Sequence, residues 1–409
     1  MTIASTEPTT SESVDAYVSR ARDWLSARLA ADDDPDMSDG RAERSYAVFH
    51  DHTDAEEREL LARGRAWQAA RVDAGFGAIT WGEEWGGPGL TATHERGYVE
   101  LERRYRAPER HETILVTVEL IAPTVHLLGT EQQRERFVRP FLRADELCCQ
   151  LFSEPGAGSD LAGLSTRATR TDTGWTVSGQ KVWSSGAQFS EWGLLIARSD
   201  PAAPKHRGMT AFLVPMDAPG VETRPIRQMS GGSTFNEVFL TDVELPDSLR
   251  LGEVGDGWSV ALTTLGFERS SSGGIVSAGG NAADLVRLAQ QLGIADDPEV
   301  RRTVGDVVAH ERATALLNAL HAERELAGHV PGIEGSLAKL VWTQNLKRVG
   351  DAAARFLGPR ILADTGEPNT YAWAEHLLGA PGYRIAGGSD EIQRNIIGER
   401  GLGLPREPR

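Results

Sequence analysis

The most specific stretch of this sequence is Leu151-Phe-Ser-Glu-Pro-Gly-Ala-Gly-Ser-Asp160-Leu-Ala-Gly163, a glycine-rich loop that follows an apolar run. Because Gly156 and Gly158 carry no Cβ, such a loop can bring backbone N–H groups close to a bound anion. It is not a Walker P-loop, since no Lys-Ser/Thr pair follows the glycines, and it is not a Rossmann turn, since no G-x-G-x-x-G opens a helix. A surface turn would explain a glycine pair alone, so the interpretation of this loop depends on the rest of the chain.

Two further motifs support a larger site. One is Gly179-Gln-Lys-Val-Trp-Ser-Ser-Gly186, and the other is Ala386-Gly-Gly-Ser-Asp-Glu-Ile-Gln-Arg-Asn-Ile-Ile-Gly-Glu-Arg400. Taken one by one, they are also typical of a strand with a buried Trp and of a glycine break before an amphipathic helix. Together with the first loop they closely resemble three signatures of the acyl-CoA dehydrogenase family. The resemblance covers roughly residues 45–405.

Composition sets limits on the function. The chain has 409 residues, which predicts two or three domains, and a net charge of −16, which makes nucleic acid and anionic membranes poor partners. The only cysteines, Cys148 and Cys149, are adjacent, and we expect them to be buried apolar residues in a reducing compartment. The polar N-terminus lacks the basic n-region and the apolar core of a signal peptide, and no apolar run approaches the roughly 20 residues of a membrane helix. We therefore expect a cytoplasmic protein, with residues 1–12 disordered.

Hydrophobic periodicity predicts an α+β fold, mainly α, in three domains. These are a helical domain over residues 13–146, an antiparallel β-barrel or sandwich over 147–255, and a C-terminal four-helix bundle over 256–409, the same order that the resemblance implies. The expected helices span Val14–Leu29, Thr53–Ala74, Thr91–Tyr105, Ile114–Leu128, Glu131–Leu142, Trp258–Ser272, Gly280–Gly293, Pro298–Gly328, Ile333–Phe356 and Asn395–Leu402. The expected strands include Trp175–Ser178, Gly193–Ala197, Met209–Val214, Val221–Pro225 and Asn236–Thr241.

The resemblance implies that the chain binds FAD and a CoA thioester. Trp183 would pack on the isoalloxazine, and Ser153 would hydrogen-bond near its N5 and O4. The full set of implied cofactor contacts is Gln150, Phe152, Ser153, Gly158, Ser159, Trp183, Ser184, Ser185, Gly358, Ser389 and Glu391, and the implied substrate contacts are Ser159, Phe267, Arg269 and Gly388. Glu154 and Asp160 are expected to be structural acids that cap the loop and the adjoining turn.

The main departure from the family lies in the third motif. Many members carry a catalytic Glu just before the Gly-Thr/Ser pair, and here that position is Gly387. Removing the α-proton of a thioester requires a carboxylate of raised basicity and donors at the thioester oxygen. Glu268 is the best candidate, because it precedes Arg269 in a Glu-Arg pair that resembles the catalytic pair of isovaleryl- and long-chain-type members. A solvent-facing helix Glu is the ordinary alternative.

The resemblance implies α,β-desaturation of a CoA thioester: Glu268 removes the α-proton, and the flavin takes the β-hydride. It further implies electron transfer to an electron-transfer flavoprotein and a homotetramer or homodimer. The family's Arg-x-x-Phe-Gly turn, which contacts the flavin pyrophosphate, is missing, and Arg301 or Arg302 either replaces it or lies on a solvated helix face. The small residues 270–274 would leave room for a bulky acyl chain, such as a branched or polycyclic one.

Three other functions remain open at this point. The first is a subunit of a heterotetrameric α₂β₂ steroid-type dehydrogenase, which Gly387 and the missing turn favour. The second is a flavin monooxygenase or oxidase on the same scaffold. The third is a non-catalytic CoA-binding or scaffold protein. No metal site is expected, because the ten histidines show no H-E-x-x-H or similar spacing.

Overall fold

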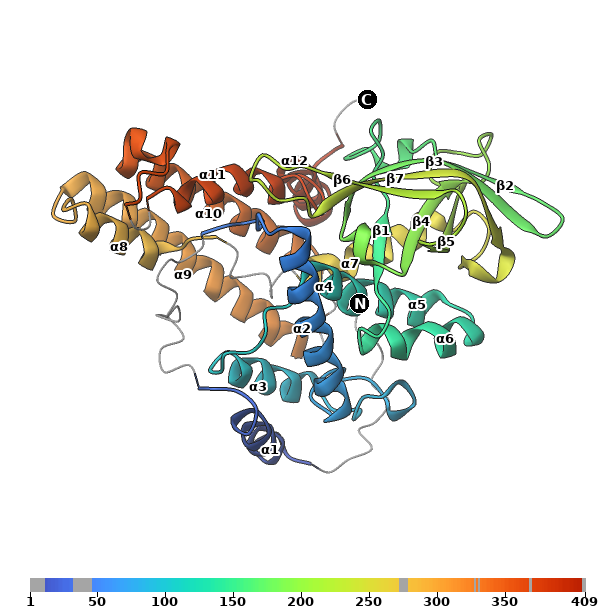
Figure 1. Cartoon of the computed structure of the whole chain (residues 1–409), viewed down its shortest axis with the longest axis horizontal. Helices are drawn as coiled ribbons and strands as arrows, with labels where there is room; N and C mark the ends of the chain where they lie inside the picture. Colours follow the sequence, from blue (N-terminus) through green and yellow to red (C-terminus); the bar gives the residue numbers. More distant parts are fainter. Residues whose placement is uncertain are drawn as a thin grey trace.

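The computed structural model describes residues 12–31, 46–271, 279–326, 329, 332–367 and 370–406. The predictions of a disordered N-terminus and of a polar loop at 32–40 therefore fall on residues outside the described part. Within that part, helices come first, a sheet follows, and helices return, as the sequence predicts. In Figure 1 the sheet lies at the upper right, the long C-terminal helices lie to the left, and the N-terminal helices lie lower, below the sheet and the bundle.

The N-terminal helices begin at side chains that cap them. Thr53 and Glu56 exchange hydrogen bonds in a capping box, and so do Thr130 and Gln133. The helices are α1 (Val14–Ser26), α2 (Asp54–Asp73), α3 (Ala92–Glu102), α4 (Glu112–Leu115), α5 (Ala122–Leu128) and α6 (Glu131–Leu142), with a 3-10 turn at Glu83–Trp85. Their aromatic core includes Tyr17, Trp67, Phe76 and Tyr98.

The helix expected from Ile114 to Leu128 has a different form. It begins two residues earlier, at Glu112, and α4 passes into the π-helical segment η2 (Val116–Ile121) before α5 continues it. π-helical turns inside α-helices are rare and occur frequently at functional sites. The earlier start makes Glu112 the first residue of this helix.

The middle domain is a mainly antiparallel sheet of eight strands. They are β1 (Cys148–Leu151), β2 (Arg167–Arg170), β3 (Gly174–Ser185), β4 (Trp192–Arg198), β5 (Met209–Pro215), β6 (Val221–Ile226), β7 (Phe235–Pro246) and β8 (Arg250–Leu251). The order along the sheet is β6-β7-β3-β2-β4-β5-β8, and β1 pairs with β4. The pairings of β4 with β1 and with β2 are parallel, which differs from the all-antiparallel expectation. The short strands β1, β2 and β8 were not predicted, because so few residues carry little periodicity.

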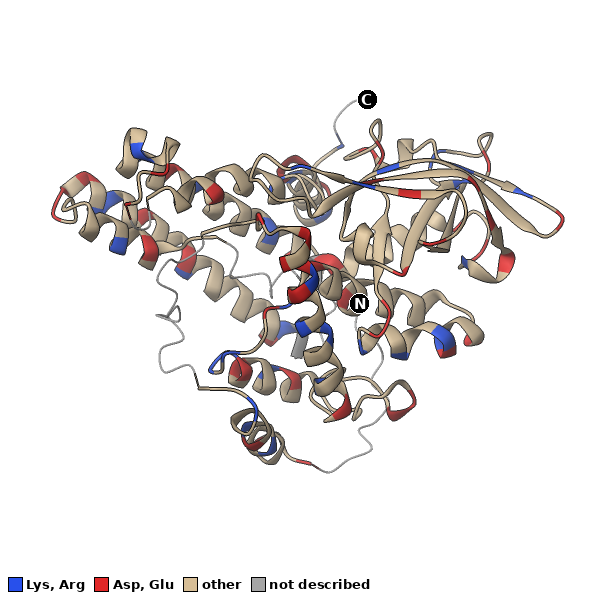
Figure 2. Cartoon of the chain, viewed as in Figure 1, with Lys and Arg blue, Asp and Glu red and all other residues tan. Residues whose placement is uncertain are grey.

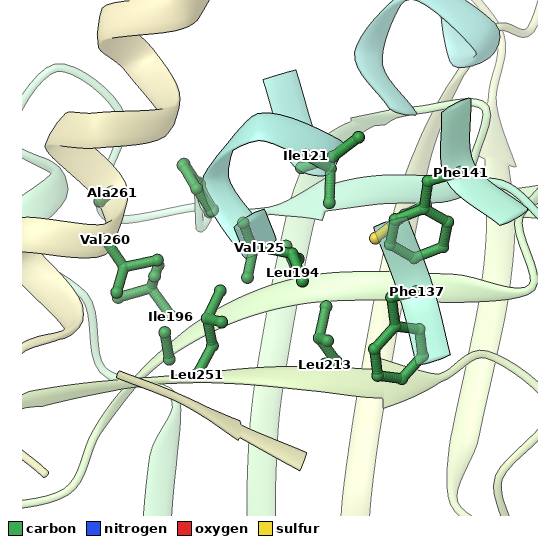
Figure 3. Packing of buried hydrophobic residues seen from close by; sticks show 14 of the residues in the cluster. Ile121, Val125, Phe137, Phe141, Leu194, Ile196, Leu213, Leu251, Val260 and Ala261 are labelled. Atoms are coloured by element: carbon green, nitrogen blue, oxygen red, sulfur yellow. The ribbon is translucent and has the colours of Figure 1, made fainter. Parts of the chain in front are cut away.

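Helices cover one face of this sheet. Helix α7 (Gly257–Ser271) packs on β4 and β5, and α5 and α6 lie beside it. Figure 3 shows the resulting core, in which side chains from the helical segments η2, α5 and α6 meet side chains from the strands β4 and β5. The helical residues are Ile121, Val125, Phe137 and Phe141, and the strand residues are Leu194, Ile196 and Leu213. Burial of these side chains is the main force that docks the sheet on the helices. Cys148 and Cys149 are free and buried in the sheet, as expected.

The C-terminal bundle contains α8 (Ala282–Gln291), α9 (Pro298–Leu326), α10 (Glu334–Leu357), α11 (Ala372–Tyr383) and α12 (Asp390–Ile396), followed by the π-helical segment η8 (Ile397–Gly401). Helix α11 was not predicted, because Gly379 and Pro381 interrupt its pattern. The last helix begins at Asp390, five residues before the predicted Asn395, because the Ser389 hydroxyl accepts a hydrogen bond from the N–H of Ile392 and caps it.

Charged residues of both signs are interspersed along the helices in the view of Figure 2. Among the described residues, no helix is long and apolar enough to cross a bilayer. The fold thus presents its site where the sheet, α7 and the start of α12 come together.

Candidate functional site

The first two sequence motifs lie side by side. The N–H of Val182 in β3 donates to the carbonyl of Ser153 at 2.9 Å, and Lys181 Nζ donates to the carbonyl of Phe152 at 3.0 Å. The glycine loop is therefore attached to β3 just before Trp183. This contact joins two segments that the sequence could only suggest belong together.

A buried ion pair holds the loop in place. Lys181 Nζ lies 2.8 Å from Glu154 Oε1, and both side chains are almost fully buried. Glu154 also accepts hydrogen bonds from the backbone N–H groups of Ser165 and Thr166. Burial alone would raise the pKa of Glu154, but the Lys181 ammonium and these donors lower it to about 2. Glu154 is thus a structural acid, as predicted.

Asp160 differs from its predicted role. It was expected to cap the adjoining turn, yet its side chain caps no helix and instead forms an exposed ion pair with Lys205. Gly158 and Ser159, just before it, are exposed, and a Cβ at Gly156 or Gly158 would meet no atom within 4 Å. This part of the loop therefore has an open surface available to a ligand.

Trp183 is held in an unusual conformation. Its φ is +62°, which is costly for a residue with a bulky side chain, and its side chain is 59% exposed. The strand has a register irregularity between Lys181 and Ser184, which turns the indole out of the sheet. Backbone strain at an exposed aromatic residue is a feature of ligand-binding sites.

Two buried polar atoms at positions predicted to contact the cofactor lack a hydrogen-bond partner within the described residues. They are Ser184 Oγ and Gln150 Nε2. Buried donors without a partner are otherwise rare. The Phe152 side chain, by contrast, is buried in the hydrophobic core, so its backbone alone can face a ligand.

The third motif forms a glycine turn against α7. Gly387 and Gly388 have φ values of +61° and +89°, and the turn ends at Ser389, the cap of α12. A Cβ built on Gly387 would overlap Glu268 Oε1. The Glu268 carboxylate therefore lies beside the Cα of Gly387, the position at which the resemblance implies an acid in many members. The turn was predicted from the sequence, but this contact across the chain was not.

Lys339 of α10 clamps that turn. Its side chain is buried, and its Nζ donates to the carbonyls of Ala386 and Gly388, on either side of Gly387. A Cβ built on Gly387 would lie 3.8 Å from Lys339 Cε. The Lys339 side chain and the Glu268 carboxylate therefore both lie next to the Cα of Gly387. The buried Asp390 adds a second anchor, since it accepts from Thr343 at 2.8 Å.

Glu112 is a second acid at this site, and the sequence analysis missed it. Ser185 Oγ donates to Glu112 Oε1 at 3.3 Å. Burial, reinforced by the charge of Glu268, raises the pKa of Glu112 to about 7. Burial raises the pKa of the Tyr383 phenol in α11, and the nearby Glu112 and Glu268 carboxylates raise it further. In the sequence, an acid at a helix start indicates only a favourable dipole partner, so no signal distinguished Glu112.

Other predicted residues are arranged as follows. Ser185 lies beside Glu112, Phe267 is half-buried on α7, and Gly358 ends α10 with a φ of +54° and open space around it. The Glu391 side chain is exposed and pairs with Arg394. The Arg269 side chain and residues 272–274 lie outside the described part, so the proposed room for a bulky acyl chain stays a prediction.

Arg301 and Arg302 lie on the exposed face of α9, where they pair with Asp296 and Glu299 respectively. Of the two interpretations left open for them, this arrangement matches the solvated helix face. No group of three His, Cys, Asp or Glu side chains in the described ranges converges on a point that could hold a metal ion.

Comparison with known proteins finds relatives that match nearly the whole chain. Three family models match successive parts of the chain: the acyl-CoA dehydrogenase N-terminal domain at residues 40–145, the middle domain at 149–243 and the C-terminal domain at 255–402. The acyl-CoA dehydrogenase IpdE1 of Mycobacterium tuberculosis is 37% identical over 97% of this chain and 99% of its own length. The acyl-CoA dehydrogenase FadE34 of the same species is 39% identical over 83% of this chain and 46% of its own length.

Solved structures with the same fold cover nearly the whole chain. The Tcur3481-Tcur3483 steroid ACAD has a TM-score of 0.76 and 25% identity, covering 98% of this chain and all of that one. Butyryl-CoA dehydrogenase from Megasphaera elsdenii shares the fold, with a TM-score of 0.70 and 24% identity over 99% of this chain and all of that one.

Proposed function

The chain belongs to the acyl-CoA dehydrogenase family, and on that premise we propose that it is a FAD-dependent enzyme that introduces a trans double bond between Cα and Cβ of a CoA thioester. Members of the family are oxidoreductases.

Glu268 is proposed to remove the α-proton. The observation that carries this assignment is the contact between the Glu268 carboxylate and Gly387. A side chain at position 387 would overlap Glu268 where it now lies. The site therefore has room for a single acid at this place, and that acid comes from α7. Lys339 keeps the glycine turn pressed against that acid. A base held in place in this way loses little entropy on reaching the α-proton.

The residues around β3 fit a flavin. Trp183 offers an exposed aromatic face in a strained backbone, and Ser184 Oγ and Gln150 Nε2 offer buried polar atoms that await a partner. A bound FAD would supply the acceptor for the β-hydride. The open backbone at Gly158 and Ser159 would bind the pyrophosphate or the pantetheine chain. Ser153, Ser185, Gly358, Ser389 and Glu391 remain proposed contacts on the resemblance alone.

The acyl group is proposed to be bulky and derived from a steroid. The similarity to a steroid ACAD structure supports this choice. The proposed electron acceptor is an electron-transfer flavoprotein. Rapid consumption of oxygen on adding substrate would instead favour an oxidase or monooxygenase.

A second candidate function is that of one subunit in a mixed assembly. The similar steroid ACAD carries a double designation, Tcur3481-Tcur3483, which favours this possibility specifically. In that case the chain would hold FAD but need its partner for full activity. A yellow, active homo-oligomer of the purified chain would contradict this second function.

The decisive experiment is anaerobic bleaching of the flavin by a panel of acyl-CoAs. The unaltered protein is expected to bleach with a steroid side-chain thioester, and Glu268→Gln is expected to keep its FAD and to lose bleaching. Glu311→Gln, which changes a half-buried carboxyl of α9 away from the site, serves as the control. Full reduction of Glu268→Gln would refute the assignment of the base.

A further inference from the structure

Glu112 is a buried acid beside the proposed base, and the mechanism above does not use it. It opens α4, and its Oε1 accepts one hydrogen bond, from Ser185 of β3. Glu268 of α7 is near enough that its charge raises the pKa of Glu112. The residue as a whole is half-buried, so part of its surface remains accessible.

Four described groups interact with the Glu112 carboxyl: Glu57 of α2, Ser185 of β3, Glu268 of α7 and Tyr383 of α11. None of these four groups is a cation. Within the described part of the chain, no Lys, Arg or His forms an ion pair with Glu112. The helix N-terminus favours the anion, yet burial outweighs it and brings the pKa of Glu112 to about 7.

A comparison within the same chain shows how much the missing cation matters. Glu154 is also buried, but Lys181 and backbone donors surround it, and its pKa falls to about 2. Glu112 has a single neutral hydroxyl donor instead. Near neutral pH it is therefore present to a large extent as a carboxylic acid, which both donates and accepts hydrogen bonds.

This part of the site has unused hydrogen-bonding capacity. Only one oxygen of Glu112 has a hydrogen bond among the described residues. A purely hydrocarbon acyl chain against the other oxygen would leave it desolvated and unbonded, at a cost of about 1–3 kcal/mol. A ligand oxygen would remove that cost.

We propose that Glu112 is a specificity-determining residue that selects CoA thioesters with a hydroxyl or keto oxygen on the acyl group, close to the carbons that react. The inference rests on the proposed function, since it assumes that the acyl chain lies beside Glu268. A site built to hydrogen-bond a substrate oxygen discriminates strongly against the analogue that lacks it.

The test measures binding without turnover. In the FAD-loaded Glu268→Gln protein, calorimetry compares the affinity for 3-cyclohexylpropanoyl-CoA with that for its 2-hydroxycyclohexyl and 2-oxocyclohexyl analogues, whose oxygen lies close to the reacting carbons. Glu112→Leu is then added in the same background. The preference for the oxygenated thioesters is expected to fall by about tenfold or more, the range of one lost hydrogen bond to a buried partner. Glu112→Gln, which keeps a donor and an acceptor, should retain most of the preference.

Glu57→Gln is the matched control, since it alters another buried carboxyl near Glu112 and should leave the preference unchanged. An unchanged ratio of affinities for the oxygenated and unoxygenated thioesters in Glu112→Leu would overturn the inference. A Glu112→Gln protein with Glu268 intact whose flavin no thioester reduces would also overturn it, because Glu112 would then be the base. Failure of the proposed function has a different signature: no thioester bleaches the flavin of the unaltered protein, whatever the binding ratio.

Discussion

Replacing Gly387 with alanine would separate backbone strain from catalysis. The φ of +61° at this position costs a residue with a Cβ about 1–2 kcal/mol, so the free energy of unfolding should fall by that amount. The new Cβ would also overlap Glu268 Oε1. To avoid it, the carboxylate would have to move by roughly 1 Å, and misplacement of that size costs on the order of 100-fold in rate.

The assay is stopped-flow reduction of the bound flavin under anaerobic conditions, with whichever thioester bleaches the unaltered protein. Gly293→Ala is the matched control, because its φ is +68° and its Cβ would meet no atom within 4 Å. Both variants should show a similar decrease in the free energy of unfolding measured in urea, but only in Gly387→Ala should the rate of flavin reduction fall. Equal reduction rates in the two variants would refute the placement of Glu268 as the base.

Three other outcomes are expected. Burial raises the pKa of Glu112 from 4.5 to about 7, so the folded state binds its proton more tightly and loses stability as pH rises through that window. In urea titrations, the free energy of unfolding of Glu112→Gln should therefore equal that of the unaltered protein near pH 4.5 and exceed it by about 1–3 kcal/mol near pH 8. Equal free energies of unfolding at both pH values would contradict this prediction. Lys181→Met should destabilise by about 3–5 kcal/mol, because it strands the buried Glu154, and adding Glu154→Gln should recover part of the loss in the same titrations. Trp183→Gly should make the flavin-free protein about 1 kcal/mol more stable, because glycine adopts the positive φ without strain. The same change should weaken FAD binding in a fluorescence titration, and an unchanged affinity would count against a flavin contact.

Much of the architecture follows from local pattern. The helix at Glu131–Leu142 matches its prediction residue for residue, and the capping pair Thr53 and Glu56 begins α2 as expected. These features depend on neighbours within one helical turn, which the sequence displays directly. The elements that were missed are the short strands and α11, where tertiary packing overrides a weak or interrupted pattern.

The sequence by itself determined which motifs the chain carries, and it located a gap at Gly387 where the related enzymes have an acid. Only the tertiary structure brought Glu268 against that glycine, because α7 and the turn before α12 lie far apart in the chain. The same holds for Lys339 clamping the turn and for Glu112 meeting Ser185. Contacts of this kind depend on how whole helices dock through their apolar faces, and no local spacing of residues encodes them.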